Sequence, residues 1–396
     1  MSTRSLETGT LPQRAGAPAN GVVWHAQPWD IPAALWAACF PPPLEGLFWY
    51  ESLARAGLED QFGFAYGVVM QGGKAVAIAP VFTMDLPMDL VAPPAVAWVL
   101  GFAGGLVRWL RVQRTLFVGS PCSDEGTVGM LAGTTLADVA PILQPALVER
   151  ARTTQSIMIV WKDFPDAAVP DLRALARTHG LFEVTSFPGA RLPLAPTFEA
   201  YLGKLSVKQR HNLRKKLRLS RDLIALDTAI LAKPDARTLE EVGRLFQNTY
   251  SKATTKFERL TPAFWSEITA RDESRVILLR RSDTGEAVAF MLAFALGERA
   301  INKYIGIDYT QGEKSYLYFR LWEAFLRWAI DIGAREVQSG QTSYQAKLDI
   351  GHQLVPLTNF ARHRNPIAHR AFALAAKGIS WSSLDEGLRQ LKGKRQ

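Results

Sequence analysis

Three side chains in the second half of the chain have types and spacings that could support chemistry on a bound ligand. Tyr344 and Lys347 lie three residues apart in a polar segment that follows a predicted strand. Lys303 lies in the apolar run 301–307. A tyrosine hydroxyl can relay a proton or bond an acceptor, and a lysine ammonium can hold a phosphate or a carboxylate. The plainer alternatives are that Tyr344 packs beneath the loop and that Lys303 is an exposed strand lysine.

The elements that must position these side chains are a strand, a loop, a helix and a second strand. Residues 301–307 roughly alternate between apolar and polar or glycine residues, as in a half-buried strand, and Lys303 is the exception. The polar loop 308–314 leads into a predicted helix over 315–332, and another strand begins at Arg335. A loop that enters a helix N-terminus offers free backbone N–H groups to a pyrophosphate or an acyl oxygen. An ordinary crossover without a ligand is the alternative.

The segment 197–221 predicts a helix pair or one long helix with a strongly basic face. From 204 to 221 every formally charged residue is positive, and leucines keep one apolar seam for packing. A solvated helix face usually carries mixed signs, so we predict that this face binds an anion: a phosphate, the tRNA backbone or a lipid headgroup. The residues assigned to this role are Lys208, Arg210, Arg214 and Lys215.

The composition limits the class of protein. The chain has 396 residues, enough for two domains, and its formal net charge of +9 favours anionic partners. Cys39 and Cys122 give neither a disulfide framework nor a metal-ligand spacing, and the histidines are scattered. We therefore expect a reducing, cytoplasmic setting and no metal. The polar residues 1–21 contain no apolar core of signal-peptide length and predict a disordered leader.

The segment 85–114 is unusually apolar and ends with three arginines. A membrane-spanning helix needs about 20 uninterrupted residues, and Pro93 and Pro94 leave only a short helical run here. Three readings stay open. The segment could lie at a membrane surface with its arginines on lipid headgroups, or form a buried helix or substrate lid, or span the membrane.

The order of predicted elements repeats between the two halves, although the residues do not. Each half holds a proline-led helix, a hairpin, a strand with a glycine-containing loop, a helix and another strand. The hairpins 63–84 and 274–297 correspond, and so do the stretches 116–161 and 301–339. This repetition predicts two copies of one α/β fold and argues against one large sheet.

Three motifs of the second half occur together over residues 197–360. They are the basic LSVKQRHNLRKKLRL, the core YIGIDYTQGEKSYLYFRLWEAFLRWAIDIGA and the closing VQSGQTSYQAKLDIG. In this order they resemble the FemAB-like, acetyltransferase-like branch of the GNAT superfamily, whose members carry tandem GNAT folds. The resemblance implies an α/β protein with mixed sheets and two GNAT-like domains. These are 22–195, with 85–114 as an apolar insertion, and the acyltransferase domain 196–370, followed by a basic tail helix over 371–396.

The resemblance also implies transfer of an acyl or aminoacyl group to an amine. No Ser-His-Asp or Cys-His order stands out, so we expect direct attack by the amine, with acyl-CoA as the donor. In GNAT proteins the backbone of a splayed strand polarises the donor carbonyl, which here falls near 304–306. The predicted donor-binding residues are Tyr304, Gly306, Gly312, Lys314 and Ser315. The predicted catalytic residues are Tyr344, Lys347 and Lys303.

The acceptor and the partners stay open at this point. We expect a small-molecule or lipid-linked amine as acceptor and a cytoplasmic protein, with peripheral contact at the inner membrane face through 85–114 as an option. One alternative is a tRNA-dependent aminoacyltransferase of the peptidoglycan type, which the short basic helix pair disfavours. Another is a non-catalytic protein that binds an anionic lipid or RNA. His352 and His363 are candidate bases by type. Gln338 stands where related proteins often carry an acid, which raises a third alternative, a degenerate enzyme that serves as a scaffold.

Overall fold

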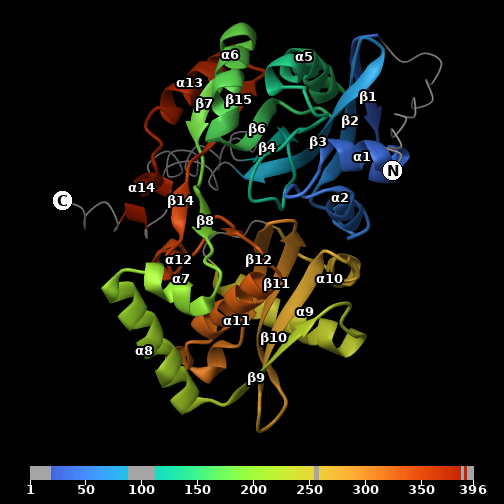
Figure 1. Cartoon of the computed structure of the whole chain (residues 1–396). Coiled ribbons are helices and arrows are strands. Elements are labelled where there is room, and N and C mark those ends of the chain that lie inside the picture. The colour runs from blue at the N-terminus through green and yellow to red at the C-terminus, as the bar shows by residue number, and fades with distance from the viewer. Residues whose placement is uncertain (1–18, 88–111, 254–257, 385–387, 390–396) are drawn as a thin grey trace, which may run out of the picture.

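The computed structural model describes residues 19–87, 112–253, 258–384 and 388–389, which fold into two lobes, each built on one β-sheet. Figure 1 shows the first sheet in the upper part of the view and the second in the lower part. Within the described ranges, no helix combines the length and the apolar character needed to cross a bilayer. Most of the predicted apolar insertion, residues 88–111, lies outside the described residues.

The first sheet has one parallel pair of strands among antiparallel neighbours. Its spatial order is β1 (Gly21–His25), β2 (Gly63–Gln71), β3 (Lys74–Pro87), β4 (Val112–Val118), β6 (Met158–Pro165), β15 (Leu357–His363) and β7 (Phe182–Thr185). The short β5 (Gly129–Met130) pairs with β3 beside this path. β4 and β6 are parallel, and α5 (Leu136–Thr153) lies between them in the chain. Together with α6 (Val169–His179), α5 covers one face of the sheet, where Leu116 and Ile159 are buried.

The second sheet is arranged in the same way. Its spatial order is β14 (Gln353–Val355), β8 (Gly189–Pro193), β13 (Glu336–Ser339), β12 (Arg299–Ile307), β11 (Ala287–Leu296), β10 (Ser274–Arg281) and β9 (Leu226–Leu231). β12 and β13 are parallel, and α11 (Leu317–Asp331) joins them. The helices α7 (Phe198–Lys204), α8 (Val207–Leu223) and α11 pack on one face. The other face carries α9 (Ala236–Lys252) and α10 (Pro262–Thr269).

The predicted repetition is confirmed. In the first sheet the antiparallel run β1 to β4 ends at the parallel neighbour β6, and in the second the run β9 to β12 ends at β13. A helix returns the chain in both places because parallel neighbours need a crossover connection. The hairpins β2–β3 and β10–β11 take the same position in their sheets. The protein is therefore an α/β protein of two GNAT-like domains.

The two sheets exchange a strand. β8 precedes the predicted boundary at 195/196, yet it pairs with β13 and β14 in the second sheet. β15 follows that boundary, yet it lies between β6 and β7 in the first sheet. In Figure 1, β8 descends from the upper lobe to the lower one. Neither sheet is therefore complete without a strand from the other side of the predicted boundary.

Several local predictions can be compared with the structure directly. The helical spacing over 315–332 corresponds to α11, and the loop before it is tightened into two short 3-10 turns. The basic segment forms a helix pair, α7 and α8, and not one long helix. The segment after β13 was expected to be a loop but contains the short helix α12 (Tyr344–Asp349). Past 371 lie the end of α13 (Pro366–Ala376) and α14 (Trp381–Leu384).

An aromatic core joins the two lobes. Trp49 of α2 (Leu47–Ala54) is fully buried, and its ring lies 5.7 Å from that of Phe294 on β11 and 6.3 Å from that of Phe264 on α10. The indole N–H of Trp49 donates to the Ser120 hydroxyl at 3.1 Å. Edge-to-face aromatic pairs add to the energy of burial, so this contact fixes the first half against the second sheet.

Candidate active site

The parallel strands β12 and β13 separate partway along their length. They pair from Arg299 opposite Glu336 to Asn302 opposite Ser339, where β13 ends, while β12 continues to Ile307. A cleft of about 270 Å³ opens beside the unpaired part of β12. The first half contributes Pro121, Cys122, Ser123, Asp124 and Lys162 to its lining, and the second half contributes residues that include Lys303, Tyr304, Gln341 and Lys347. The cleft is therefore built by both lobes.

Lys303 lies at the base of this cleft in an acidic setting. Its Nζ donates to Glu45 Oε1 at 2.5 Å, lies 3.9 Å from Asp124 Oδ2 and sits 4.5 Å from the centre of the Trp49 ring. Only 1% of the side chain is exposed, so the alternative of an exposed strand lysine is excluded. Burial alone would lower the pKa of Lys303, but the two carboxylates outweigh it and raise the pKa. Lys303 is therefore a fixed positive charge at neutral pH.

Asp124 and Lys347 have pKa values close to neutrality. Burial raises the pKa of the Asp124 carboxyl to about 6 against the attraction of Lys303, and the negative charge of Glu45 nearby raises it further. Burial lowers the pKa of Lys347 to about 8, against the attraction of Asp124. The Lys347 Nζ donates to the Gly340 carbonyl at 2.5 Å. Groups with such values can exchange protons with a substrate at physiological pH.

Four residues that line the cleft hold buried polar atoms without a hydrogen-bond partner in the described part of the chain. These atoms are Asp124 Oδ2, Asn302 Nδ2, the Tyr318 hydroxyl and Gln341 Nε2. The other end of the Asn302 amide is fixed, because its Oδ1 accepts from Ser339 Oγ at 2.9 Å. Buried polar groups are nearly always paired in folded proteins. A carboxylate oxygen, two amide nitrogens and a hydroxyl left open in one cleft suit a polar ligand.

Two other acidic groups of the cleft have raised pKa values. Tyr304 donates to Glu258 Oε1 at 2.6 Å, and burial raises the pKa of Glu258. Burial also raises the pKa of the Cys122 thiol well above its usual value. A thiol attacks as the thiolate, so Cys122 is not an activated nucleophile.

The structure brings some predicted site residues to the cleft and leaves others outside it. Lys303, Tyr304 and Lys347 line the cleft. Tyr344 does not; it is 2% exposed, and its hydroxyl donates to the Pro188 carbonyl at 3.0 Å, which favours the packing alternative. A Cβ at Gly306 would lie 2.6 Å from the α9 backbone, so this glycine permits the close approach of α9. The lack of a side chain at Gly306 therefore allows tight packing against α9.

The predicted loop residues before α11 do not line the cleft. The Ser315 hydroxyl donates to the Gly312 carbonyl at 2.6 Å, and the Ser315 carbonyl accepts from Ser220 on α8 at 2.6 Å. Lys314 belongs to the same 3-10 turn, which ends at Tyr316 in a left-handed conformation with φ 47°. Their role in donor binding stays a prediction.

Both candidate histidines and Gln338 also lie outside the cleft lining. Burial lowers the pKa of His352 to about 3, and its ring packs 4.8 Å from that of Trp322. His363 lies on β15 in the first sheet. The Gln338 amide oxygen accepts from Arg299 at 2.9 Å. An acid at this position would face a guanidinium instead of the cleft.

The basic face of α8 remains available to a partner. Lys208, Arg214 and Lys215 are exposed, whereas Arg210 is half-buried and donates to the Gly203 carbonyl at 3.4 Å. Lys216, on the same helix, is held by Asp349 at 3.2 Å. Anion binding by this face stays a prediction.

Sequence reasoning missed the acidic residues of the cleft. Glu45 follows the Pro41–Pro43 cluster, Asp124 lies in the loop after β4, and Glu258 lies before α10. The repeat offered one signal for Asp124, because the loop after β4 corresponds to the loop after β12, where a ligand was predicted. The sequence around Glu45 and Glu258 gave no signal of a site, since an acid in a loop is ordinarily solvated.

Comparison with known families and structures identifies the second half. Residues 195–377 match the FemAB-like family, described as peptidoglycan biosynthesis/recognition. The chain is similar to this family over these residues. No curated protein matches the chain.

The fold of this protein is also found in solved structures with little sequence identity. L-PGS from Bacillus licheniformis is 11% identical, with a TM-score of 0.52, and the match covers 82% of this chain and 90% of that one. FemX is 10% identical, with a TM-score of 0.53, and the match covers 81% of this chain and 93% of that one. Both matches extend over the two lobes, so they support the tandem architecture.

Proposed function

We propose that the protein is an N-acyltransferase that moves an acyl group from acyl-CoA to an amine by direct attack. The observation that carries this proposal is the cleft beside the unpaired part of β12, where Asp124 and Lys347 have pKa values near neutrality. An amine becomes a nucleophile only after it loses a proton, and a buried acceptor with a pKa near the working pH is suited to remove it.

Each polar group of the cleft has a role in this reaction. Asp124, as the carboxylate, accepts the proton of the incoming ammonium. The amine nitrogen then attacks the thioester carbonyl, a C–N bond forms, the C–S bond breaks, and the CoA thiolate leaves with a proton. The open amide donors of Asn302 and Gln341 are suited to the negative charge that develops on the carbonyl oxygen. Lys303 holds Asp124 in place and balances its charge.

The un-ionised Cys122 supports direct attack over a covalent acyl-enzyme. The tRNA-dependent alternative has no specific observation in its favour, because the exposed basic face belongs to a single helix, α8, of 17 residues. Lysines on one helix are equally suited to other anions.

A ligand survey tests the donor first. A ligand at a hundred times its dissociation constant stabilises the native state by about 2.7 kcal/mol, which a thermal shift detects. We expect CoA and acyl-CoA to stabilise the protein and Asp124→Asn to keep that binding while losing transfer to an amine. Stabilisation by charged tRNA alone, with no response to any thioester, would count against the acyl-CoA donor.

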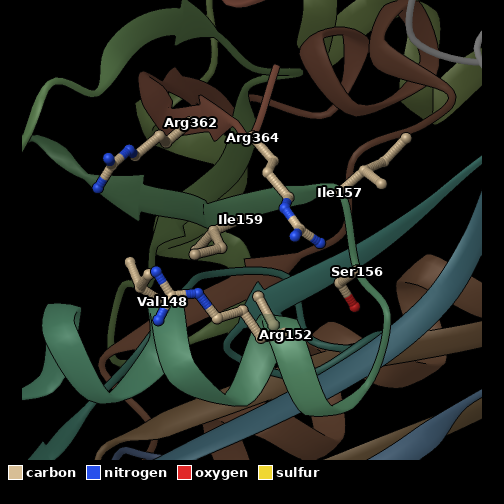
Figure 2. Close-up of a pocket in the computed structure, with 8 residues that line it drawn as sticks. Val148, Arg152, Ser156, Ile157, Ile159, Arg362 and Arg364 are labelled. Carbon is tan, nitrogen blue, oxygen red and sulfur yellow. The ribbon is translucent and has the colours of Figure 1, made fainter. Parts of the chain in front are cut away.

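We also infer that the first lobe contacts an anionic membrane surface. Figure 2 shows Arg152, Arg362 and Arg364 around a hollow of about 230 Å³ whose lining includes Ile157 and Ile159. Arg152 pairs with Glu149 at 3.0 Å, whereas no acidic partner is found for Arg362 or Arg364 among the described residues. Arginine side chains around an apolar floor are suited to a lipid phosphate.

The hollow lies at the edge of the sheet where the apolar insertion begins and ends. β3 stops at Pro87, which pairs with Val112 on β4. Two positions further along β4, the Arg114 carbonyl accepts from the Ile157 amide at 2.9 Å, and the Ile157 carbonyl accepts from the Arg364 amide at 2.7 Å. An apolar sequence and a basic hollow at one sheet edge suit peripheral binding, which needs both contributions.

Vesicle co-sedimentation tests this contact. We expect binding to phosphatidylglycerol vesicles, little binding to phosphatidylcholine vesicles, and weaker binding as salt is raised. Arg362→Glu with Arg364→Glu should abolish it, whereas Arg275→Glu with Arg335→Glu, a matched pair on the second lobe, should not. Equal binding by both double variants would overturn the assignment.

A further inference from the structure

A second cavity lies against the face of the first sheet that α5 and α6 do not cover. It measures about 150 Å³. Its floor is formed by Phe82, Phe117 and Val160, which are cross-strand neighbours on β3, β4 and β6. Side chains opposite one another in a sheet share a face, so these three form one continuous apolar surface.

Much of the wall of this cavity is also apolar, although the polar residues Asp163, Ser186 and Asn359 border it as well. The rings of Phe82 and Phe117 stack at 4.7 Å, and Phe62 meets Phe82 edge-on at 5.8 Å. Ile379 and Leu384, from the C-terminal segment, line it as well. Polar groups placed against these rings would lose their hydrogen bonds to water without replacement, whereas methylene groups would gain from burial there.

The apolar cavity and the active-site cleft share part of their lining. Pro121, Lys162, Glu258 and Gln341 border both. A ligand that spans this shared boundary has one end beside Asp124 and the other end on the phenylalanine floor. The cleft holds charged and unpaired polar groups, whereas the floor of the cavity is apolar. The two ends of the ligand must therefore differ in chemistry.

We propose that the cavity holds the alkyl chain of a substrate whose polar, reacting end lies in the cleft, so that the enzyme acts on an amphiphile. The assignment of the reacting end rests on the proposed acyl transfer; the binding of the chain does not. The alkyl chain belongs either to the acyl group of the donor or to the tail of the amine acceptor. Both have the same chemistry in the cavity, and binding measurements separate them.

Chain-length dependence is the measurement that tests this proposal. Each buried methylene should tighten binding by about fourfold until the cavity is full. Calorimetric titration of the protein with acetyl-, butyryl-, octanoyl- and dodecanoyl-CoA measures how the affinity for the donor depends on acyl-chain length. Titration with butylamine, octylamine and dodecylamine follows the acceptor. Val160→Phe narrows the cavity from its floor, and Val207→Phe, at a site on α8 that is 74% exposed, is the matched control.

We expect Val160→Phe to weaken long-chain ligands at least tenfold in one of the two series and to leave its shortest member unchanged. Loss in the CoA series assigns the cavity to the donor, and loss in the amine series assigns it to the acceptor. Phe117→Ala enlarges the cavity and should move the preference in that series to longer chains. This variant replaces Val160→Phe as the test if Val160→Phe folds poorly. Affinity independent of chain length in both series, or equal effects of Val160→Phe and Val207→Phe, overturns the proposal. If the protein neither binds CoA nor transfers an acetyl group from acetyl-CoA, the proposed function is overturned. The alkylamine series then still decides whether the cavity binds an alkyl chain.

Discussion

The Lys303 ammonium lies 2.5 Å from the Glu45 carboxylate, although 258 positions separate the two residues in the chain. Glu45 precedes α2 in the first half, and Lys303 lies on β12 in the second sheet. This ion pair therefore forms only when the two lobes are docked. The ion pair also holds the Lys303 ammonium beside Asp124. The electrostatics of the cleft therefore depend on the lobe interface.

Removal of the buried ammonium should destabilise the protein strongly. Lys303→Met leaves the Glu45 and Asp124 carboxylates in the interior without their cation, and breaking such a pair costs about 3–5 kcal/mol. Urea unfolding measures the loss. Arg335→Ala, which removes an exposed partner of Glu298, is the control and should cost about 1 kcal/mol or less. Similar losses for both variants would show that Lys303 is not a buried structural charge.

Loss of the Asp124 carboxylate should stop the reaction without unfolding the protein. Asp124→Asn keeps the shape of the side chain but cannot accept the amine proton, so kcat should fall about a hundredfold or more. Asp331→Asn, an exposed isosteric change on α11, should leave kcat unchanged. Full activity in Asp124→Asn would remove Asp124 from the mechanism and leave Lys347 as the proton acceptor.

The pH dependence should distinguish these two acceptors. Asp124 accepts a proton only as the carboxylate, so kcat/KM should rise with pH through about 6, and this limb should vanish in Asp124→Asn. A rise centred near 8 would assign the role to Lys347. Because the folded-state pKa of Asp124 lies above the unfolded value of about 3.9, folding takes up a proton between these values. The contribution of Asp124 to stability should thus fall as pH rises from about 4 to 6, relative to Asp124→Asn.

A methyl group at Gly306 should separate β12 from α9. The added Cβ would meet the backbone of Leu245 and Phe246 at 2.6 Å, and backbone cannot rotate away as a side chain can. We expect Gly306→Ala to cost about 1–3 kcal/mol or more in thermal or urea unfolding and to impair activity through the displaced strand. Gly203→Ala on α7 meets nothing within 4 Å and should be neutral or stabilising. Equal stability of the two variants would contradict the packing role of Gly306.

The sequence predicted the local elements well because their signals are local. The hairpin β10–β11 and the helix α11 follow from alternation and helical spacing within short windows. Lys303 and Lys347 were chosen by residue type and position, and both line the cleft. Tyr344 was chosen on the same grounds, but its hydroxyl bonds the Pro188 carbonyl instead.

The rest depends on contacts between distant segments, which periodicity does not encode. The carboxylates of Glu45 and Asp124 enter the cleft only because α2 and the loop after β4 dock on the second sheet. The raised pKa of Asp124 comes from this burial, so no feature of the loop sequence could predict it. The exchange of β8 and β15 likewise follows from pairing partners that lie far away in the chain.

The exchanged strand has a consequence for synthesis on the ribosome. β7 finds its only neighbour within the described sheet in β15, whose last residue is His363, and β6 obtains its antiparallel partner from the same strand. A nascent chain that has emerged only as far as residue 195 therefore carries the first sheet with an unfilled gap. The first lobe can close its sheet only after β15 has left the exit tunnel, so the two lobes must mature together.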